Sequence, residues 1–221
     1  MMRLEDEENL PEECGLALAF TPVALRGAAA VFFVLDQRLA RIVASSSEPM
    51  LAQMKLAWWR ETLLKPVDER PNGDAVLDAA SRHCADNGAG LVALVDGWEH
   101  LLEEPPLGEE HALGFANGRS AALSSALNLS DSKQVPAAFV RAVRSWALAD
   151  LAANVSLEDE RAFLIELAKQ SEPSNGKLPR KARGVAVLAA LGKRSIERGG
   201  RPLMEGRGAA LVAMRAGLIG T

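Results

Sequence analysis

The stretch 31–64 constrains the fold of this chain most strongly. It reads VFFVLDQRLARIVASSSEPMLAQMKLAWWRETLL, and its first five residues are apolar on every side of a helix. Such a turn is expected to lie inside a bundle, with neighbours all round. Ser45–Ser47 and Pro49 then predict a stop and a restart, because serine caps helices and proline suits a first turn. We therefore expect helices over 23–44 and 49–64.

The rest of the chain has the same helical character. Alanine and leucine are abundant and β-branched residues are scattered, which favours helix over sheet. Prolines, glycines and acidic starts divide the remainder into further expected helices: 74–86, 90–104, 109–128, one from Pro136, 157–170, 180–198 and 207–218. There is no alternating strand pattern and no internal repeat. The sequence predicts an all-α fold, a single bundle of eight or nine helices over 14–221, after an acidic, disordered leader at 1–13.

Cysteines and apolar runs bear on localisation. Cys14 and Cys84 could pair in principle, but their surroundings do not suggest a disulfide framework, so a reduced compartment is favoured. No uninterrupted apolar run reaches the ~20 residues that a membrane-spanning helix needs. The nearest, Gly15–Leu35, is broken by Pro22 and Arg26. We expect a cytoplasmic protein, at most peripheral to a membrane.

The net charge of −4 is unevenly distributed. From Lys177 onward, ten Lys and Arg residues face only Glu197 and Glu205, so this segment carries +8 and the first 176 residues carry −12. A basic segment can attract diphosphates, nucleic acid or an anionic membrane surface. Val187 and Leu191 interrupt its basic sector, however, so a solvated face that complements the acidic remainder is the simpler interpretation. Nucleic acid is not an expected partner.

Polar side chains are interleaved with the apolar pattern of the first two helices. They are the candidate ligand-binding residues: Asp36, Arg38, Gln53, Lys55 and Arg60. In a bundle, some of them could line a central cavity. The sequence supports equally well the alternative that they are exposed or pair with each other. Because cations outnumber the single aspartate, such a cavity would suit an anionic head group without magnesium.

Two acidic pairs are the only candidates for a metal site. Asp74 and Asp78 have the i,i+4 spacing that places both carboxylates on one helical face, and Asp96 and Glu99 share a sector of the next helix. The first pair is better explained as acids in a first helical turn, and the second as the wet face of an amphipathic helix. No histidine or cysteine spacing matches a zinc pattern. We predict no resident metal.

An apolar helix, a Glu-Pro turn and a helix ending in LAWWRETL resemble the N-terminal helix pair of the squalene/phytoene synthase family. The likeness continues through LVALVDGWEHLLEEPPL at 91–107, GFANGRSAAL at 114–123 and LPRKARGVAVL at 178–188. The resemblance implies an isoprenoid synthase fold. Active members condense two prenyl diphosphates head to head, using magnesium held by aspartate-rich motifs.

The chain differs from that family at the positions of the aspartate-rich, metal-binding motifs. Leu39, Ala40 and Val43 stand where active members carry an Asp-Asp-x-x-Asp motif, and aliphatic side chains offer magnesium no oxygen. In the helix expected near 140–157, where the second motif should fall, Asp150 is the only acid. The chain also has no tyrosine. The resemblance therefore implies the fold more strongly than the activity.

Two functions of different class follow. The first is a degenerate relative with no catalytic residues and no cofactor, which binds an apolar lipid or a partner protein. It is similar to the branch that contains the mitochondrial complex I assembly factor. The second is an active prenyltransferase making a carotenoid or hopanoid precursor, with Asp74, Asp78, Asp96 or Glu99 recruited to magnesium. The motif losses favour the first, and the candidate partners are an isoprenoid or other apolar ligand, a protein, or a membrane surface.

Overall fold

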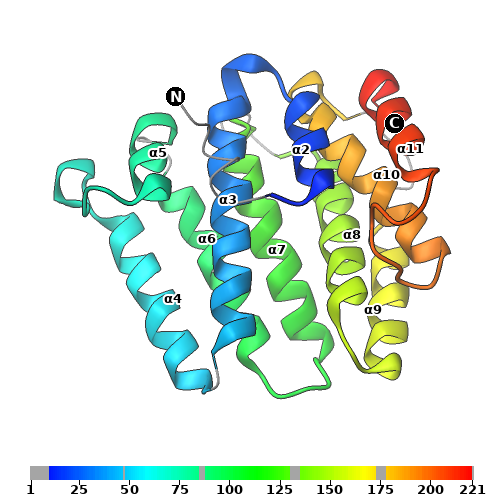
Figure 1. Cartoon of the computed structure of the whole chain (residues 1–221), viewed down its shortest axis with the longest axis horizontal. Coiled ribbons are helices and arrows are strands. Elements are labelled where there is room, and N and C mark those ends of the chain that lie inside the picture. Colours follow the sequence, from blue (N-terminus) through cyan, green and yellow to red (C-terminus); the bar gives the residue numbers. More distant parts are fainter. Residues whose placement is uncertain (1–9, 47, 85–87, 130–134, 173–177, 221) are drawn as a thin grey trace.

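The computed structural model describes residues 10–46, 48–84, 88–129, 135–172 and 178–220. Within these ranges the chain is one all-α domain with ten α-helices and no strand (Figure 1). The α-helices are α2 (Glu12–Ala19), α3 (Val23–Ser45), α4 (Pro49–Leu64), α5 (Ala75–His83), α6 (Gly88–Glu99), α7 (Glu109–Ala126), α8 (Ala137–Asn154), α9 (Glu158–Gln170), α10 (Arg183–Glu197) and α11 (Ala209–Ile219). Short 3-10 turns are η1 (Val67–Glu69), η3 (His100–Leu102) and η4 (Arg180–Ala182). The all-α prediction is confirmed, but eight or nine helices was too few.

The additional helix is α2, which begins inside the segment expected to be a leader. Pro11 precedes it, and Glu12 and Glu13 occupy its first turn, where negative charge is favourable. The expected leader at 1–13 therefore overlaps a helix at its end, and residues 1–9 lie outside the described residues.

Helix α3 is the central helix, as the sequence predicts. Eight consecutive residues, from Ala29 to Asp36, are buried, so this part of the helix has neighbours on every side. It packs against α2, α4, α5, α6 and α7. In Figure 1, α3 crosses in front of α6 and α7, with α4 on one flank and α8 on the other.

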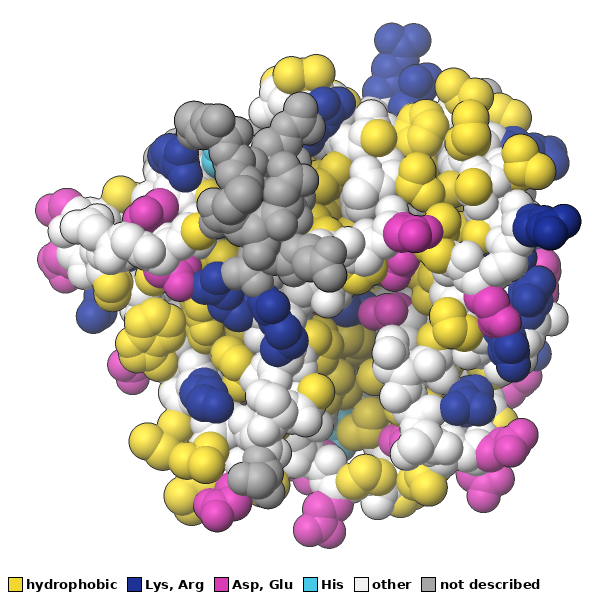
Figure 2. Space-filling model, in the orientation of Figure 1, with side chains coloured by type: hydrophobic (Ala, Val, Ile, Leu, Met, Phe, Trp, Pro, Cys, Tyr) yellow, Lys and Arg dark blue, Asp and Glu magenta, His cyan; other side chains and the backbone are white. Residues whose placement is uncertain are grey.

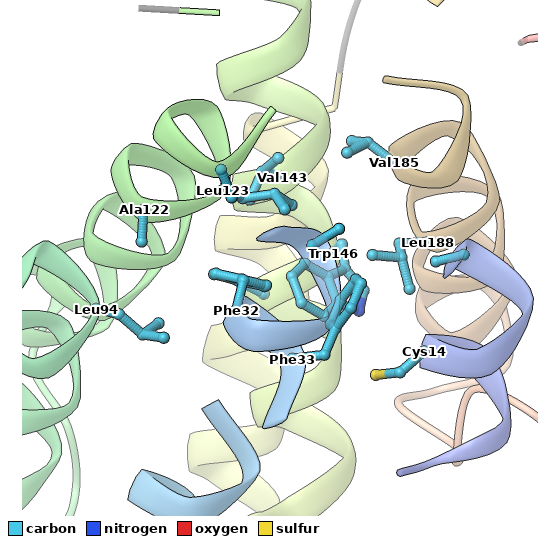
Figure 3. Packing of buried hydrophobic residues seen from close by; sticks show 14 of the residues in the cluster. Cys14, Phe32, Phe33, Leu94, Ala122, Leu123, Val143, Trp146, Val185 and Leu188 are labelled. Carbon is cyan, nitrogen blue, oxygen red and sulfur yellow. The ribbon is translucent and has the colours of Figure 1, made fainter. Parts of the chain in front are cut away.

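Aromatic side chains connect α3 to the second half of the bundle. Phe33 of α3 meets Trp146 of α8 edge to face, with ring centroids 6.4 Å apart and an interplanar angle of 79°. Figure 3 shows Cys14 of α2 and Leu188 of α10 on the far side of this indole. One contiguous core therefore runs from α3 through α8 to α10.

Helices α6 and α7 approach each other through glycine. A Cβ atom on Gly118 would lie 2.4 Å from the carbonyl oxygen of Ala93 and 2.6 Å from the Cα atom of Gly97. The two backbones are therefore in direct contact. Trp98 and Arg119, the residues that follow these glycines, are brought side by side at the centre of the bundle.

Two expectations on localisation can be compared with the fold. Cys14 and Cys84 are both buried and free, not joined to each other. None of the helices in the described ranges combines the length and the apolar character needed to cross a membrane.

Candidate functional site

A buried arginine organises the centre of the bundle. Arg119 of α7 is 2% exposed, and its Nε and Nη2 atoms lie 3.0 and 2.7 Å from Oδ1 and Oδ2 of Asp36 on α3. Its Nη1 atom donates to Oδ2 of Asp150 on α8, at 2.7 Å. The bidentate contact is the strongest geometry available to this pair of groups. One guanidinium thus joins three helices.

Aromatic rings surround the same guanidinium. Its central carbon lies 4.6 Å from the ring centroid of Phe115, 4.8 Å from that of Trp146 and 5.4 Å from that of Trp98. Rings at these distances attract a cation, more so where water is excluded. Trp98 also donates its indole N–H to Oδ1 of Asp36, at 2.7 Å. We call Asp36, Trp98, Arg119 and Asp150 the central cluster.

The electrostatics of the central cluster keep Arg119 charged. Burial opposes the charged guanidinium, but Asp36 and Asp150 outweigh that effect, and the pKa of Arg119 is raised. The pKa of Asp36 is raised above its usual value, because burial outweighs the opposing effects of the Arg119 charge and of the hydrogen bonds from Arg119 and Trp98.

One side of the central cluster faces an opening. Figure 2 shows a hollow between α3 and α8 whose depth is mostly hydrophobic, with a basic and an acidic side chain at its upper end. The side chain of Asp150 is 22% exposed, whereas those of Asp36 and Arg119 are each 2% exposed. Asp150 is therefore the member of the cluster that solvent or a ligand could reach.

Helix α2 adds two titratable groups to this region. Burial raises the pKa of Glu13, and the charges of Asp150 and Glu12 add to the rise, whereas a backbone hydrogen bond and, to a smaller extent, the charge of Arg119 lower it. Burial also raises the pKa of the Cys14 thiol well above its usual value. A protonated, buried thiol is a poor nucleophile, so Cys14 serves packing.

Glu13→Gln is expected to stabilise the fold at pH 7. Because the pKa of Glu13 is raised from 4.5 by burial, the folded state binds its proton more tightly, and stability falls as the pH rises from 4.5 through the folded-state pKa. The uncharged amide removes that cost. Urea unfolding at pH 4 and pH 7 checks this. The gain should vanish at the lower pH, and Glu12→Gln, on the exposed side of the same turn, should show no such gain.

The predicted ligand-binding residues do not converge on one site. Asp36 lies in the central cluster, and Arg38 pairs instead with Asp74 and lies over the ring of Trp59. Arg60 is bound to Asp96 and Glu99 of α6. Gln53 and Lys55 are exposed on α4.

The acidic pairs considered for magnesium are engaged elsewhere. Asp74 is the N-cap of α5, its Oδ1 accepting from the backbone N–H groups of Val76 and Leu77 at 2.9 and 3.0 Å, and Asp78 lies in the first turn. Both of the α6 acids contact Arg60. Across the described parts of the chain, no three His, Cys, Asp or Glu side chains are grouped to hold a metal ion.

Sequence reasoning missed Arg119 and Trp98 as site residues. The available signal was an arginine on a helix whose neighbours are small and apolar, in GFANGRSAAL, together with single aspartates on two other apolar helices. A buried arginine needs acceptors for its N–H groups, and carboxylates also compensate its charge. Asp36 and Asp150 are single acids on apolar helices and were candidates for that role.

Comparison of the chain with protein-family models, curated proteins and solved structures found no match.

Proposed function

We propose that this chain is a non-catalytic relative of the squalene/phytoene synthases and acts by binding a partner protein. The absence of catalysis is supported by the position of Arg119. Its guanidinium lies between Asp36 and Asp150, 2.7 Å from an oxygen of each. Arg119 therefore already supplies the positive charge that a metal ion would otherwise bring to these two carboxylates. A magnesium ion bridging these carboxylates would have to displace a bidentate, buried guanidinium.

The surface of α3 next to the central cluster supplies no replacement ligands. Leu39 is buried, and Ala40 and Val43 are partly buried against the core. The resemblance requires carboxylates at these three positions for magnesium and diphosphate chemistry, and aliphatic groups cannot provide it. The central cluster therefore supports a structural role in place of catalysis.

The outer face of α4 supports a binding role. Met50, Met54 and Trp58 recur every four residues and are 70%, 64% and 45% exposed. Leu51 and Leu64 on the same helix are also exposed. Figure 2 shows hydrophobic side chains gathered over this flank of the molecule. Methionine and tryptophan are enriched at protein interfaces, and a contiguous exposed apolar stripe is typical of them.

The charges around this stripe favour a protein over an anionic membrane. Glu48 and Glu61 balance Lys55 and Lys65 in number, and Arg60 is bound to carboxylates of α6. A helix that lies on an anionic membrane carries a basic polar face, which α4 lacks. An apolar stripe with balanced charge suits a groove or a helix face of a second protein.

Replacing Met54 and Trp58 together by glutamate is expected to weaken partner binding and leave the fold intact, because both side chains are exposed. A photocrosslinking residue at position 54 of the full chain would identify the partner in cells. The affinity of that purified partner should fall at least tenfold, about 1.4 kcal/mol, in the double variant. Leu157→Glu, at an exposed apolar site outside α4, is the matched control.

Two results would contradict the proposal. One is release of pyrophosphate from farnesyl or geranylgeranyl diphosphate with magnesium, lost in Asp36→Asn, which would make the chain an active prenyltransferase. The other is binding of lipid vesicles, in place of any protein, that depends on Met54 and Trp58.

A further inference from the structure

A cavity of about 730 Å³ lies between α8, α10 and α11, and the described residues that line it include none of α4 and none of the central cluster. Small apolar side chains form much of its wall, among them Ala142, Ala186 and Ala189. Lys193, Arg194 and Arg215 line it as well, against Glu172 and Glu197. Cavities of this size with apolar walls and a few polar groups are typical of sites for small molecules.

A buried hydroxyl lies in this wall without a hydrogen-bond partner among the described residues. It belongs to Ser145 of α8, which is 2% exposed and lines the cavity, and its Oγ atom is the one left unpaired. Burying a hydroxyl without a partner costs free energy. A group that supplies an acceptor or donor here would recover that cost.

The hydroxyl and the basic residues lie at one level of the helix packing. A Cβ atom on Gly192 would lie 3.1 Å from the Cα atom of Trp146, so the backbones of α8 and α10 are in contact there. Ser145 directly precedes Trp146, and Lys193 directly follows Gly192. Arg215 reaches the same cavity from α11.

The basic groups differ in how far they are already engaged. Lys193 lies 3.6 Å from a carboxylate oxygen of Glu172, and Arg194 donates to the backbone carbonyl of Glu205 at 2.9 Å. Arg215 makes no ion pair with any carboxylate of the described residues, and it is exposed. It is therefore the cation that is available to an incoming anion.

We propose that this cavity binds a single-chain amphiphilic anion. Its phosphate or carboxylate head contacts Ser145, Lys193 and Arg215, and its alkyl chain lies along the alanines of α8 and α10. The excess of cations over acids in the wall selects the charge of the head. The apolar wall selects a ligand with an alkyl chain. This site is separate from the α4 face, so either proposal can fail without the other.

Dodecyl phosphate, below its micelle concentration, is the probe, and calorimetric titration is the measurement. Binding should weaken at least tenfold in Arg215→Glu and in Ala189→Trp, which fills the cavity. Arg207→Glu removes an exposed cation next to the same helix but outside the cavity, and Met54→Glu changes only the α4 face. Both should bind as the unaltered chain does.

Ser145→Ala separates a ligand role from a structural one. Since no described residue forms a hydrogen bond with this hydroxyl, its loss should not lower the melting temperature, but it should weaken dodecyl phosphate binding severalfold. If inorganic phosphate bound as tightly as dodecyl phosphate, the proposed role of the alkyl chain would be wrong. If dodecanol bound as tightly, the proposed role of the anionic head would be wrong. No binding at all, or binding indifferent to Arg215→Glu, would overturn the site. Capture of dodecyl phosphate only when it is embedded in phosphatidylcholine vesicles would overturn it in favour of a membrane surface.

Discussion

Arg119→Met is expected to destabilise the fold by about 3–5 kcal/mol. The substitution keeps most of the side-chain volume and removes the cation, so Asp36 is left 1% exposed with no compensating charge. Asp36 would keep only the hydrogen bond from the indole of Trp98. Asp150, at the edge of the cluster, can turn to solvent at less cost. The free energy of unfolding in urea measures the effect.

A second variant shows whether the cost comes from the buried charge. Asp36→Asn also removes a charge, and its amide oxygen can still accept from Trp98. If the penalty of Arg119→Met is an uncompensated carboxylate, the double variant should be more stable than the two single losses predict, by at least 1 kcal/mol. Strictly additive losses would mean that the arginine stabilises the fold independently of Asp36, through its contacts with the rings and with Asp150.

Arg70 provides a matched control for burial. It is 7% exposed, and its guanidinium donates to the backbone carbonyls of Leu63 and Lys65 at 2.9 and 3.1 Å. Among the residues that the structure describes, no carboxylate pairs with it. Arg70→Met loses hydrogen bonds but leaves no buried charge, so about 1–2 kcal/mol is expected. An Arg119→Met penalty no larger than this would contradict the central role of the cluster.

The helices could be predicted because their signals are local. Pro49, the serines before it and the acids at the start of α5 and α7 each act on the adjacent turn, and α3 and α4 match the predicted 23–44 and 49–64 to within one residue. Helix α2 was missed although Glu12 and Glu13 are the same kind of first-turn acid. Their position in a run of acids made them look like part of a solvated leader.

The central cluster could be predicted only in part, because its partners are distant in sequence. Asp36 was a candidate, but Trp98 and Arg119 lie 62 and 83 positions away, and no local pattern says which helix faces meet. Helix geometry alone already argues against the expected grouping of Asp36 with Arg38 in one site. Two residues along a helix are about 200° apart, so one of them points to the core when the other points to α5.

Gly118→Ala is expected to cost about 2–3 kcal/mol, within the range for overpacking of a tight core. The added carbon would lie 2.4 Å from the carbonyl oxygen of Ala93 and 2.6 Å from the Cα atom of Gly97. Both are backbone atoms, so no side chain can move aside, and α6 and α7 must separate. Gly15→Ala is the control, because nothing lies within 4 Å of its Cβ position and alanine should stabilise α2 by about 0.5–1 kcal/mol.

The same substitution tests whether the glycine contact builds the central cluster. If α6 moves away from α7, the indole of Trp98 moves away from Asp36, and their 2.7 Å hydrogen bond lengthens. The indole N–H signal of Trp98 should then shift upfield and exchange faster with solvent, while that of exposed Trp58 stays unchanged. A loss of stability with the Trp98 signal unmoved would mean that the strain is absorbed elsewhere along α6. The glycines would then pack the helices without positioning the cluster.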